Sequence, residues 1–250
     1  MDAWKSAPVG RQHSSEAAHR RSGKTLDPAA ITSKGWARSL WSFSGGDGIV
    51  EYATNDLGRG RGNLPMSRDE QTFIHRTFEL LDRLTGLAFK QVSSPADADI
   101  RVYCAGKLGG SEGVAYKRKG WFDVYWKDKK GWDLTTFEKH VIRHEIGHAL
   151  GLDHPYGSGA NPRFNTRDTV MSYNWVGNTT FTPIDIQALQ RLWGAGGLRR
   201  SGGDQGQGSR PRRQGRAPGC AGRCAAGRSV LRCPGCWHPC RSAVAWFRSG

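Results

Sequence analysis

Residues 144–154 read His-Glu-Ile-Gly-His-Ala-Leu-Gly-Leu-Asp-His, and the fold and chemistry of the chain are predicted from this stretch outward. On a helix, His144 and His148 lie one turn apart on the same face, so both imidazoles can reach a single Zn²⁺. Glu145 stands beside the first of these ligands. Its carboxylate is therefore placed to take a proton from a metal-bound water.

The second half of this stretch supplies a turn and a third ligand. Gly151 lets the chain leave the helix through a conformation that side chains disfavour. The turn then brings His154 back towards the two helical histidines. Three protein ligands leave one coordination position open, which is typical of a catalytic rather than a structural zinc site.

A methionine turn follows the zinc motif. Met171 falls within Thr-Val-Met-Ser-Tyr, seventeen positions after His154. This combination is the signature of the metzincins, and the chain resembles that family. Within it, Met-Ser-Tyr resembles the serralysin-type secreted bacterial metalloproteases and also the astacins, with the matrixins as the nearest alternative.

Other segments share this resemblance. Residues 181–194 are similar to the closing helix of serralysins and matrixins, while residues 98–102 and 36–43 are similar much more loosely. The resemblance covers roughly residues 30–196 and is specific only across residues 141–194.

The resemblance implies a role for each site residue. The three histidines would bind zinc, and Glu145 would act as general base and acid. Met171 would form the apolar floor beneath the metal, with Gly151 as the structural turn. Tyr173 matches the tyrosine that in serralysins ligates zinc and then swings to stabilise the oxyanion. The segment between His154 and Met171 is shorter than in typical serralysins, which leaves the substrate preference open.

The function implied is a secreted zinc metalloendopeptidase. Peptide bonds in proteins would be hydrolysed by a zinc-activated water with Glu145 as base, without a covalent intermediate. The expected partners are protein and peptide substrates and, by resemblance, a type I exporter and a proteinaceous inhibitor. The chain is expected to act as a monomer.

Two further residues are judged structural. His140 lies one turn before His144, but the zinc geometry is already filled, so a packing or second-shell role is expected. Cys104 stands alone in a predicted strand and is most simply a buried thiol.

The surrounding pattern predicts an α+β fold. Ser67 and Glu70 form a capping box that opens a helix ending at Gly86. The last helix begins at Thr182 and Pro183 and closes at Gly194. By family resemblance, the sheet would be twisted and mostly parallel, and the strand at 121–126 would carry the substrate. Strands are predicted at 87–92, 99–104 and 121–126, and the long zinc helix at 134–150.

Composition divides the chain into three parts: residues 1–30, 31–196 and 197–250. The first is polar and is expected to be a disordered, propeptide-like segment; the second is the protease domain. The first part contains no apolar signal-peptide core, and no run in the chain is long enough to span a membrane. Serralysins resemble this, because they are exported without such a peptide. An extracellular location is therefore expected.

The third part is a basic, Gly-, Arg- and Cys-rich tail that is expected to be disordered. Residues 195–250 hold eleven Arg and a single acid, Asp204, so they carry most of the net charge of +15. Five of the six cysteines lie here, and Cys233-Pro-Gly-Cys236 is a C-x-x-C. A zinc or redox module and an Arg/Gly-rich arm for nucleic acid are both compatible with this composition.

The explanation favoured for the tail is a frameshift near residues 196–210 that replaced a run of calcium-binding repeats. Serralysins continue at this point into acidic Gly-Gly-x-Gly-x-Asp repeats that bind Ca²⁺, whereas the tail keeps the Gly and lacks the Asp. Arg codons of a G+C-rich gene read one nucleotide later become Gly codons. Calcium is thus expected of the family, although its sites are not visible here. The alternative function, a basic nucleic-acid or metal-binding protein that retains a protease-like fold, rests on this tail alone.

Overall fold

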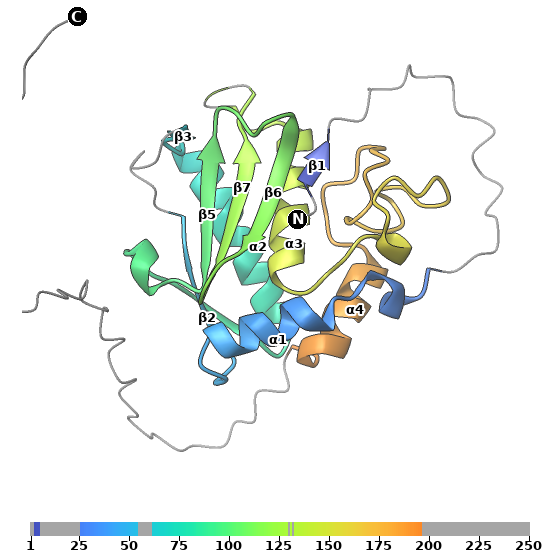
Figure 1. Cartoon of the computed structure of the whole chain (residues 1–250), viewed down its shortest axis with the longest axis horizontal. Helices are drawn as coiled ribbons and strands as arrows, with labels where there is room; N and C mark the ends of the chain where they lie inside the picture. The colour runs from blue at the N-terminus through green and yellow to red at the C-terminus, as the bar shows by residue number, and fades with distance from the viewer. Residues whose placement is uncertain (1–2, 6–25, 55–61, 130, 132, 197–250) are drawn as a thin grey trace, which may run out of the picture. The chain divides into compact units, whose positions relative to one another are not determined.

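The computed structural model describes residues 3–5, 26–54, 62–129, 131 and 133–196. The predictions for the tail at 197–250 lie outside these residues, as does most of the predicted N-terminal segment, so the three-part division stays a prediction. Within the described part, one mixed sheet is packed with four α-helices and short 3₁₀ turns (Figure 1). The predicted α+β class is confirmed.

The sheet is mostly parallel, and its strand order is β1-β6-β7-β5-β2-β4, with β3 paired to β5. The pairs β2–β4, β2–β5 and β5–β7 are parallel, whereas β6 runs antiparallel to β7 and β1 antiparallel to β6. The strands are β1 Ala3–Lys5, β2 Ile49–Ala53, β3 Asn63–Leu64, β4 Ala88–Gln91, β5 Ile100–Ala105, β6 Ser111–Lys117 and β7 Phe122–Lys127.

The predicted helices are present, and their caps explain where they begin. The helix α2, Arg68–Leu84, starts behind the capping box of Ser67 and Glu70. The zinc helix α3, Thr136–Ala149, starts behind a second capping box, of Thr135 and Glu138, which was not predicted. The helix α4, Pro183–Trp193, ends at Gly194 with φ 78°. The fourth helix, α1, Lys34–Phe43, coincides with the loosely similar segment.

Gly86 does not end α2 as predicted. The C-cap is Thr85, in extended conformation, and φ of Gly86 is not positive. A Cβ on Gly86 would lie 2.2 Å from the carbonyl oxygen of Trp193. The glycine is therefore needed for the close approach of this turn to the end of α4, rather than for a helix stop.

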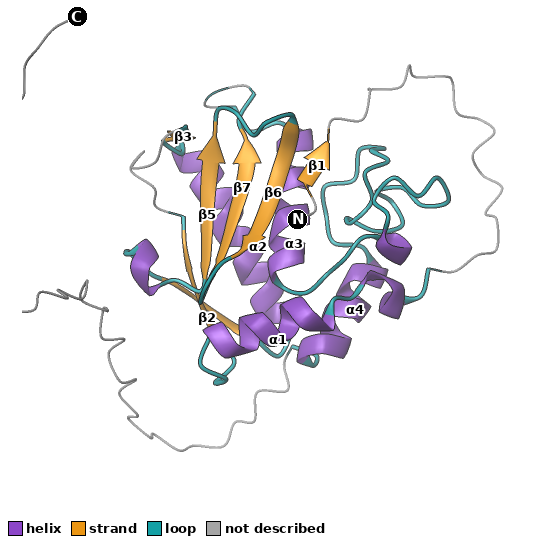
Figure 2. Ribbon diagram, in the orientation of Figure 1, coloured by secondary structure: helices purple, strands orange, loops and turns teal. Residues whose placement is uncertain are grey.

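The core lies between the sheet and the helices α2 and α3 (Figure 2). Alternate residues of β5 and β7 face it, as the period-two pattern predicts. Tyr52 of β2 stacks on Phe78 of α2, with ring centroids 3.9 Å apart, and Phe122 of β7 meets Trp36 of α1 at 5.0 Å. The core residues at alternate positions of β5 and β7 are Ile100, Val102, Cys104, Phe122, Val124 and Trp126.

The prediction that the strand at 121–126 carries the substrate is wrong. The strand β7 is paired on both sides, with β5 and β6, so its backbone groups are already used. The strand β6 lies outside β7, and the short strand β1 pairs along its other side (Figure 1). The strand β6 was not predicted, because Ser111, Glu112 and Gly113 weaken its strand pattern.

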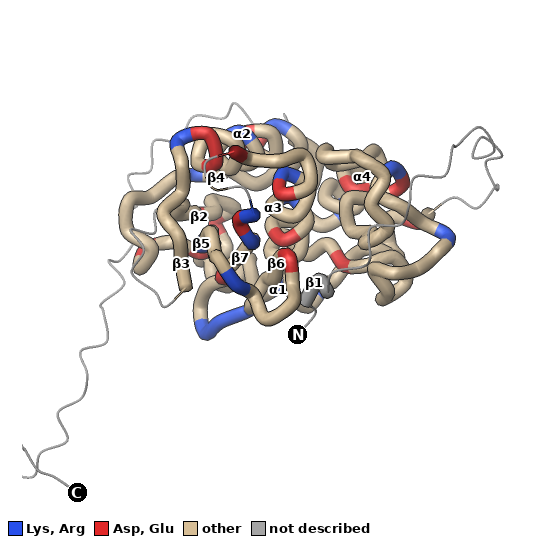
Figure 3. Tube along the Cα trace, turned by 90° about the horizontal axis from the view of Figure 1, so that it is seen from above, with Lys and Arg blue, Asp and Glu red and all other residues tan. Residues whose placement is uncertain are grey.

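Charged residues of both signs are interspersed along the described chain, and neither sign fills a whole side in the view of Figure 3. Among the described residues, no helix is long and apolar enough to cross a membrane.

Candidate metal and active site

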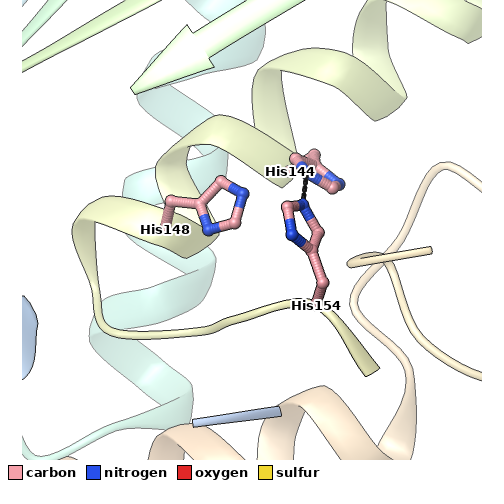
Figure 4. A group of neighbouring side chains, drawn as sticks. All are labelled: His144, His148 and His154. Atoms are coloured by element: carbon pink, nitrogen blue, oxygen red, sulfur yellow. Dashed lines mark hydrogen bonds between the residues drawn. The ribbon is translucent and has the colours of Figure 1, made fainter. Parts of the chain in front are cut away.

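The three motif histidines converge at the end of α3 (Figure 4). One ring nitrogen from each of His144, His148 and His154 lies within 4.8 Å of the others. All three side chains are buried. Nε2 of His144 and Nε2 of His154 are 3.3 Å apart. The predicted ligand set is therefore brought together by the fold.

Backbone carbonyls fix the orientation of two of the rings. Nδ1 of His144 donates to the carbonyl of Val170 at 2.9 Å, and Nδ1 of His148 donates to that of Leu152 at 3.0 Å. With Nδ1 protonated, the Nε2 lone pair of each ring is left to face a metal ion, which is the usual arrangement for metal-binding histidines.

The turn after α3 ends in a Schellman motif. The amide of Leu152 donates to Gly147 at 2.8 Å, and that of Gly151 donates to His148 at 2.9 Å. Gly151 has φ 92°, a conformation that glycine adopts without strain. The same turn thus delivers His154 and aims the Leu152 carbonyl at His148.

Burial makes positive charge on this cluster costly. The pKa of His144 is lowered well below its ordinary value, first by burial and then by its histidine neighbours. Neutral imidazoles are the form that binds a metal, and three nitrogen donors with one open position suit Zn²⁺. The donor set therefore fits the ion implied by the motif.

Glu145 lies on the side of α3 that faces β6. Its side chain is 1% exposed, and Oε2 has no hydrogen-bond partner among the described groups. Burial raises its pKa well above the ordinary value, although a backbone hydrogen bond from Ala115 opposes the shift. A carboxylate held this way can take up a proton readily.

Met171 lies close to α3, and Tyr173 lies beside two of the histidines. Met171 is fully buried, and its Sδ would be 2.9 Å from a Cβ on Gly147. The ring of Tyr173 lies 4.7 Å from that of His154 and 5.5 Å from that of His144, between centroids. His140 lies outside the group, with its ring 4.8 Å from that of Trp175. Burial lowers the pKa of His140 to about 3.

Three residues that support the site are not among those predicted from the sequence. Asp185 is buried in α4 and accepts hydrogen bonds from Thr169, from the amide of Val170 at 2.9 Å and from Thr182. Gly113 of β6 and Gly147 of α3 allow close contacts with Glu145 and Met171. The pattern Thr-Pro-x-Asp could have signalled Asp185 as a helix cap, whereas nothing local signals the two glycines.

Curated relatives of the chain include serralysins, matrix metalloproteinases and a hatching enzyme. The chain is 34% identical over 101 residues to Serralysin G of Dickeya chrysanthemi, an overlap of 33% of this chain and 21% of that protein. Matrix metalloproteinase-C of Caenorhabditis elegans is 27% identical over 73% of this chain and 33% of its own length. Hatching enzyme of Paracentrotus lividus is 28% identical over 38% of this chain and 20% of its own.

The overlaps span only a fifth to a third of the length of these relatives. No family model matches the chain. Among solved structures, the GM1-bound form of the ECX AB5 holotoxin aligns with 63% of this chain and 83% of that chain. At 15% identity and a TM-score of 0.41 it is too distant to bear on fold or function. Serralysins, matrix metalloproteinases and hatching enzyme are all metzincins, and the resemblance of this chain to the metzincins is confirmed.

Proposed function

We propose that the chain is a zinc-dependent metalloendopeptidase with the metzincin fold. The observation that carries this proposal is the convergence of His144, His148 and His154 beside the buried carboxylate of Glu145. Bound to the three histidines, zinc would supply Lewis acidity towards a water molecule and a peptide carbonyl.

Glu145 moves the proton in this proposal. Its unpartnered Oε2 takes a proton from the attacking water and then gives it to the leaving amine. The raised pKa favours the protonated form that the second step requires. Tyr173, whose ring lies against two of the histidines, is the group assigned to donate a hydrogen bond to the oxyanion.

The side of β6 that pairs with β1 provides a place for the substrate backbone. Gly113 brings β6 so close to α3 that an added Cβ would stand 2.7 Å from Oε1 of Glu145. A peptide that pairs with β6 therefore runs past the proposed catalytic carboxylate. The chain's own β1 pairs there antiparallel, with Ala3 opposite Val114 and Lys5 opposite Ser111. A substrate would take the place of β1.

Hydrolysis of casein by the zinc-loaded full chain tests the proposal. Activity should be lost in Glu145→Gln and on chelation, and should be retained in Glu79→Gln, which removes an exposed carboxylate of α2. Zinc bound at one equivalent to the histidines without any peptide hydrolysis would contradict it.

An extracellular location belongs to the same proposal and is tested by the distribution of the chain between cells and medium. The serralysin-like rather than matrixin-like assignment also stays open, because relatives of both kinds are found. The expected calcium, exporter and inhibitor stay predictions.

A further inference from the structure

A second group of metal-ligating side chains lies apart from the histidines. Glu70 belongs to the first turn of α2, Cys104 to the end of β5, and Asp128 follows β7 directly. One ligand atom from each of the three lies within 4.8 Å of the others. The group thus joins three segments that are distant in the sequence.

Only one of the two oxygens of the Glu70 carboxylate has a hydrogen-bond partner among the described groups. Its Oε2 accepts a hydrogen bond from the amide of Ser67, which completes the capping box. Oε1 is buried and has no hydrogen-bond partner among the described groups, and the residue as a whole is 2% exposed. A buried acceptor without a partner is costly. The helix cap therefore explains one oxygen and leaves the other unexplained.

The charges around this oxygen favour a cation. Burial, and then the carboxylates of Glu70, Asp128 and Glu138, raise the pKa of the Cys104 thiol well above its ordinary value. Burial also raises the pKa of Glu70. Glu138 is a neighbour rather than a ligand, because both of its carboxylate oxygens already accept hydrogen bonds. The donors are the N-cap Thr135 and the backbone amide of Lys129.

We propose that Glu70, Cys104 and Asp128 form a second metal site, of the zinc class. A thiolate with two carboxylates matches Zn²⁺, whereas Ca²⁺ and Mg²⁺ prefer oxygen donors alone. Binding would take the proton from the Cys104 thiol into the solvent and give Oε1 of Glu70 its missing partner. Asp128 is half-buried at the rim, with Oδ1 accepting from the amide of Gly131 at 2.7 Å. The site would tie the start of α2 to β5 and to the end of β7.

Co²⁺ binding to the full chain tests this site, because only a thiolate ligand gives sulfur-to-cobalt charge-transfer absorption. The background carries Ser at the five tail cysteines, so Cys104 is its single thiol, and His148→Ala with His154→Ala to disable the histidine cluster. We expect one equivalent of Co²⁺ with charge-transfer absorption. The replaced tail residues are Cys220, Cys224, Cys233, Cys236 and Cys240.

Matched variants separate ligand loss from misfolding. Cys104→Ser should abolish the absorption, and Glu70→Gln should weaken Co²⁺ binding at least about tenfold, by comparison with the loss of mere outer-shell partners. Gln still serves as an N3 cap, so circular dichroism should be unchanged. Asp69→Asn, which removes a neighbouring exposed charge, should bind normally.

Zinc content provides a second measurement with the histidines intact. The tail-substituted chain should hold two zinc ions and its Cys104→Ser variant one. Equal zinc content in the two chains, or Co²⁺ binding without charge-transfer absorption, would show that Glu70 is only a helix cap and Cys104 only a core residue.

Discussion

Replacing Gly113 with alanine tests how closely β6 is packed against the proposed catalytic carboxylate. By local preference alone the change should raise the free energy of unfolding, since a glycine inside a strand costs about 0.5–1 kcal/mol relative to alanine. The structure predicts the opposite. The new Cβ would stand 2.5 Å from Cγ1 of Val141, 2.7 Å from Oε1 of Glu145 and 2.8 Å from its Cγ.

The expected magnitude follows from these contacts. Overpacking a buried site costs about 1–3 kcal/mol, which exceeds the local gain. We therefore expect Gly113→Ala to lower the free energy of unfolding by about 0.5–2 kcal/mol, taken from the lower and the upper ends of these two ranges. Because Glu145 must move to admit the methyl group, kcat/KM should fall about 100-fold, as for a 1 Å misplacement of a catalytic group.

Urea unfolding and hydrolysis of a fluorogenic peptide measure the two effects. Gly35→Ala is the matched control, since Gly35 lies in α1 with nothing within 4 Å of its added Cβ. That variant should gain up to about 1 kcal/mol in stability and keep full activity. A Gly113→Ala chain as stable and as active as the parent would refute the close packing. Lost stability with unchanged kcat/KM would refute the positional link to Glu145.

Three further outcomes are expected. Deleting residues 1–5 should raise kcat/KM in peptide assays, because β1 occupies the edge of β6 that a substrate would use; a drop in activity would contradict that placement. Asp185→Asn should lower the free energy of unfolding by about 1–3 kcal/mol, because an amide cannot satisfy all the donors around Asp185. It should also weaken zinc binding about 10–100-fold in competition with a chelator, as for other partners behind a metal ligand. The raised pKa of Glu70 means that the folded chain holds this proton more tightly than the unfolded chain. The metal-free protein should therefore lose stability as pH rises through that pKa, and Glu70→Gln, compared by thermal unfolding across pH, should not.

Much of the site was readable from the sequence because it is local. The ligands His144 and His148 follow from helical periodicity, and His154 follows from Gly151, whose φ of 92° is the turn that the glycine predicts. The caps Ser67 and Thr182 likewise act within three residues of themselves. Such features depend on a few neighbouring dihedral angles, so a short pattern is enough to identify them.

The features of the fold and the site that were not predicted depend on contacts between segments distant in the sequence. The strand β6 carries a weak strand pattern, and its position follows from antiparallel pairing with β7 rather than from its own residues. Gly86 was expected to stop a helix and instead admits the carbonyl of Trp193. The pairing of Glu70 with Cys104 links residues 34 positions apart, and no local pattern relates them.

The orientation of the metal ligands depends on two turns more than on the helix that bears them. His148 is oriented by the carbonyl of Leu152, in the Schellman turn, and His144 by the carbonyl of Val170, before the methionine. The second turn is in turn held by Asp185 of α4 through the Val170 amide. A chain with the zinc motif but without this aspartate would keep its ligands and lose the group that orients one of them. Zinc affinity should therefore be more sensitive to Asp185 than to His140, although His140 lies a single turn from His144 on α3 itself.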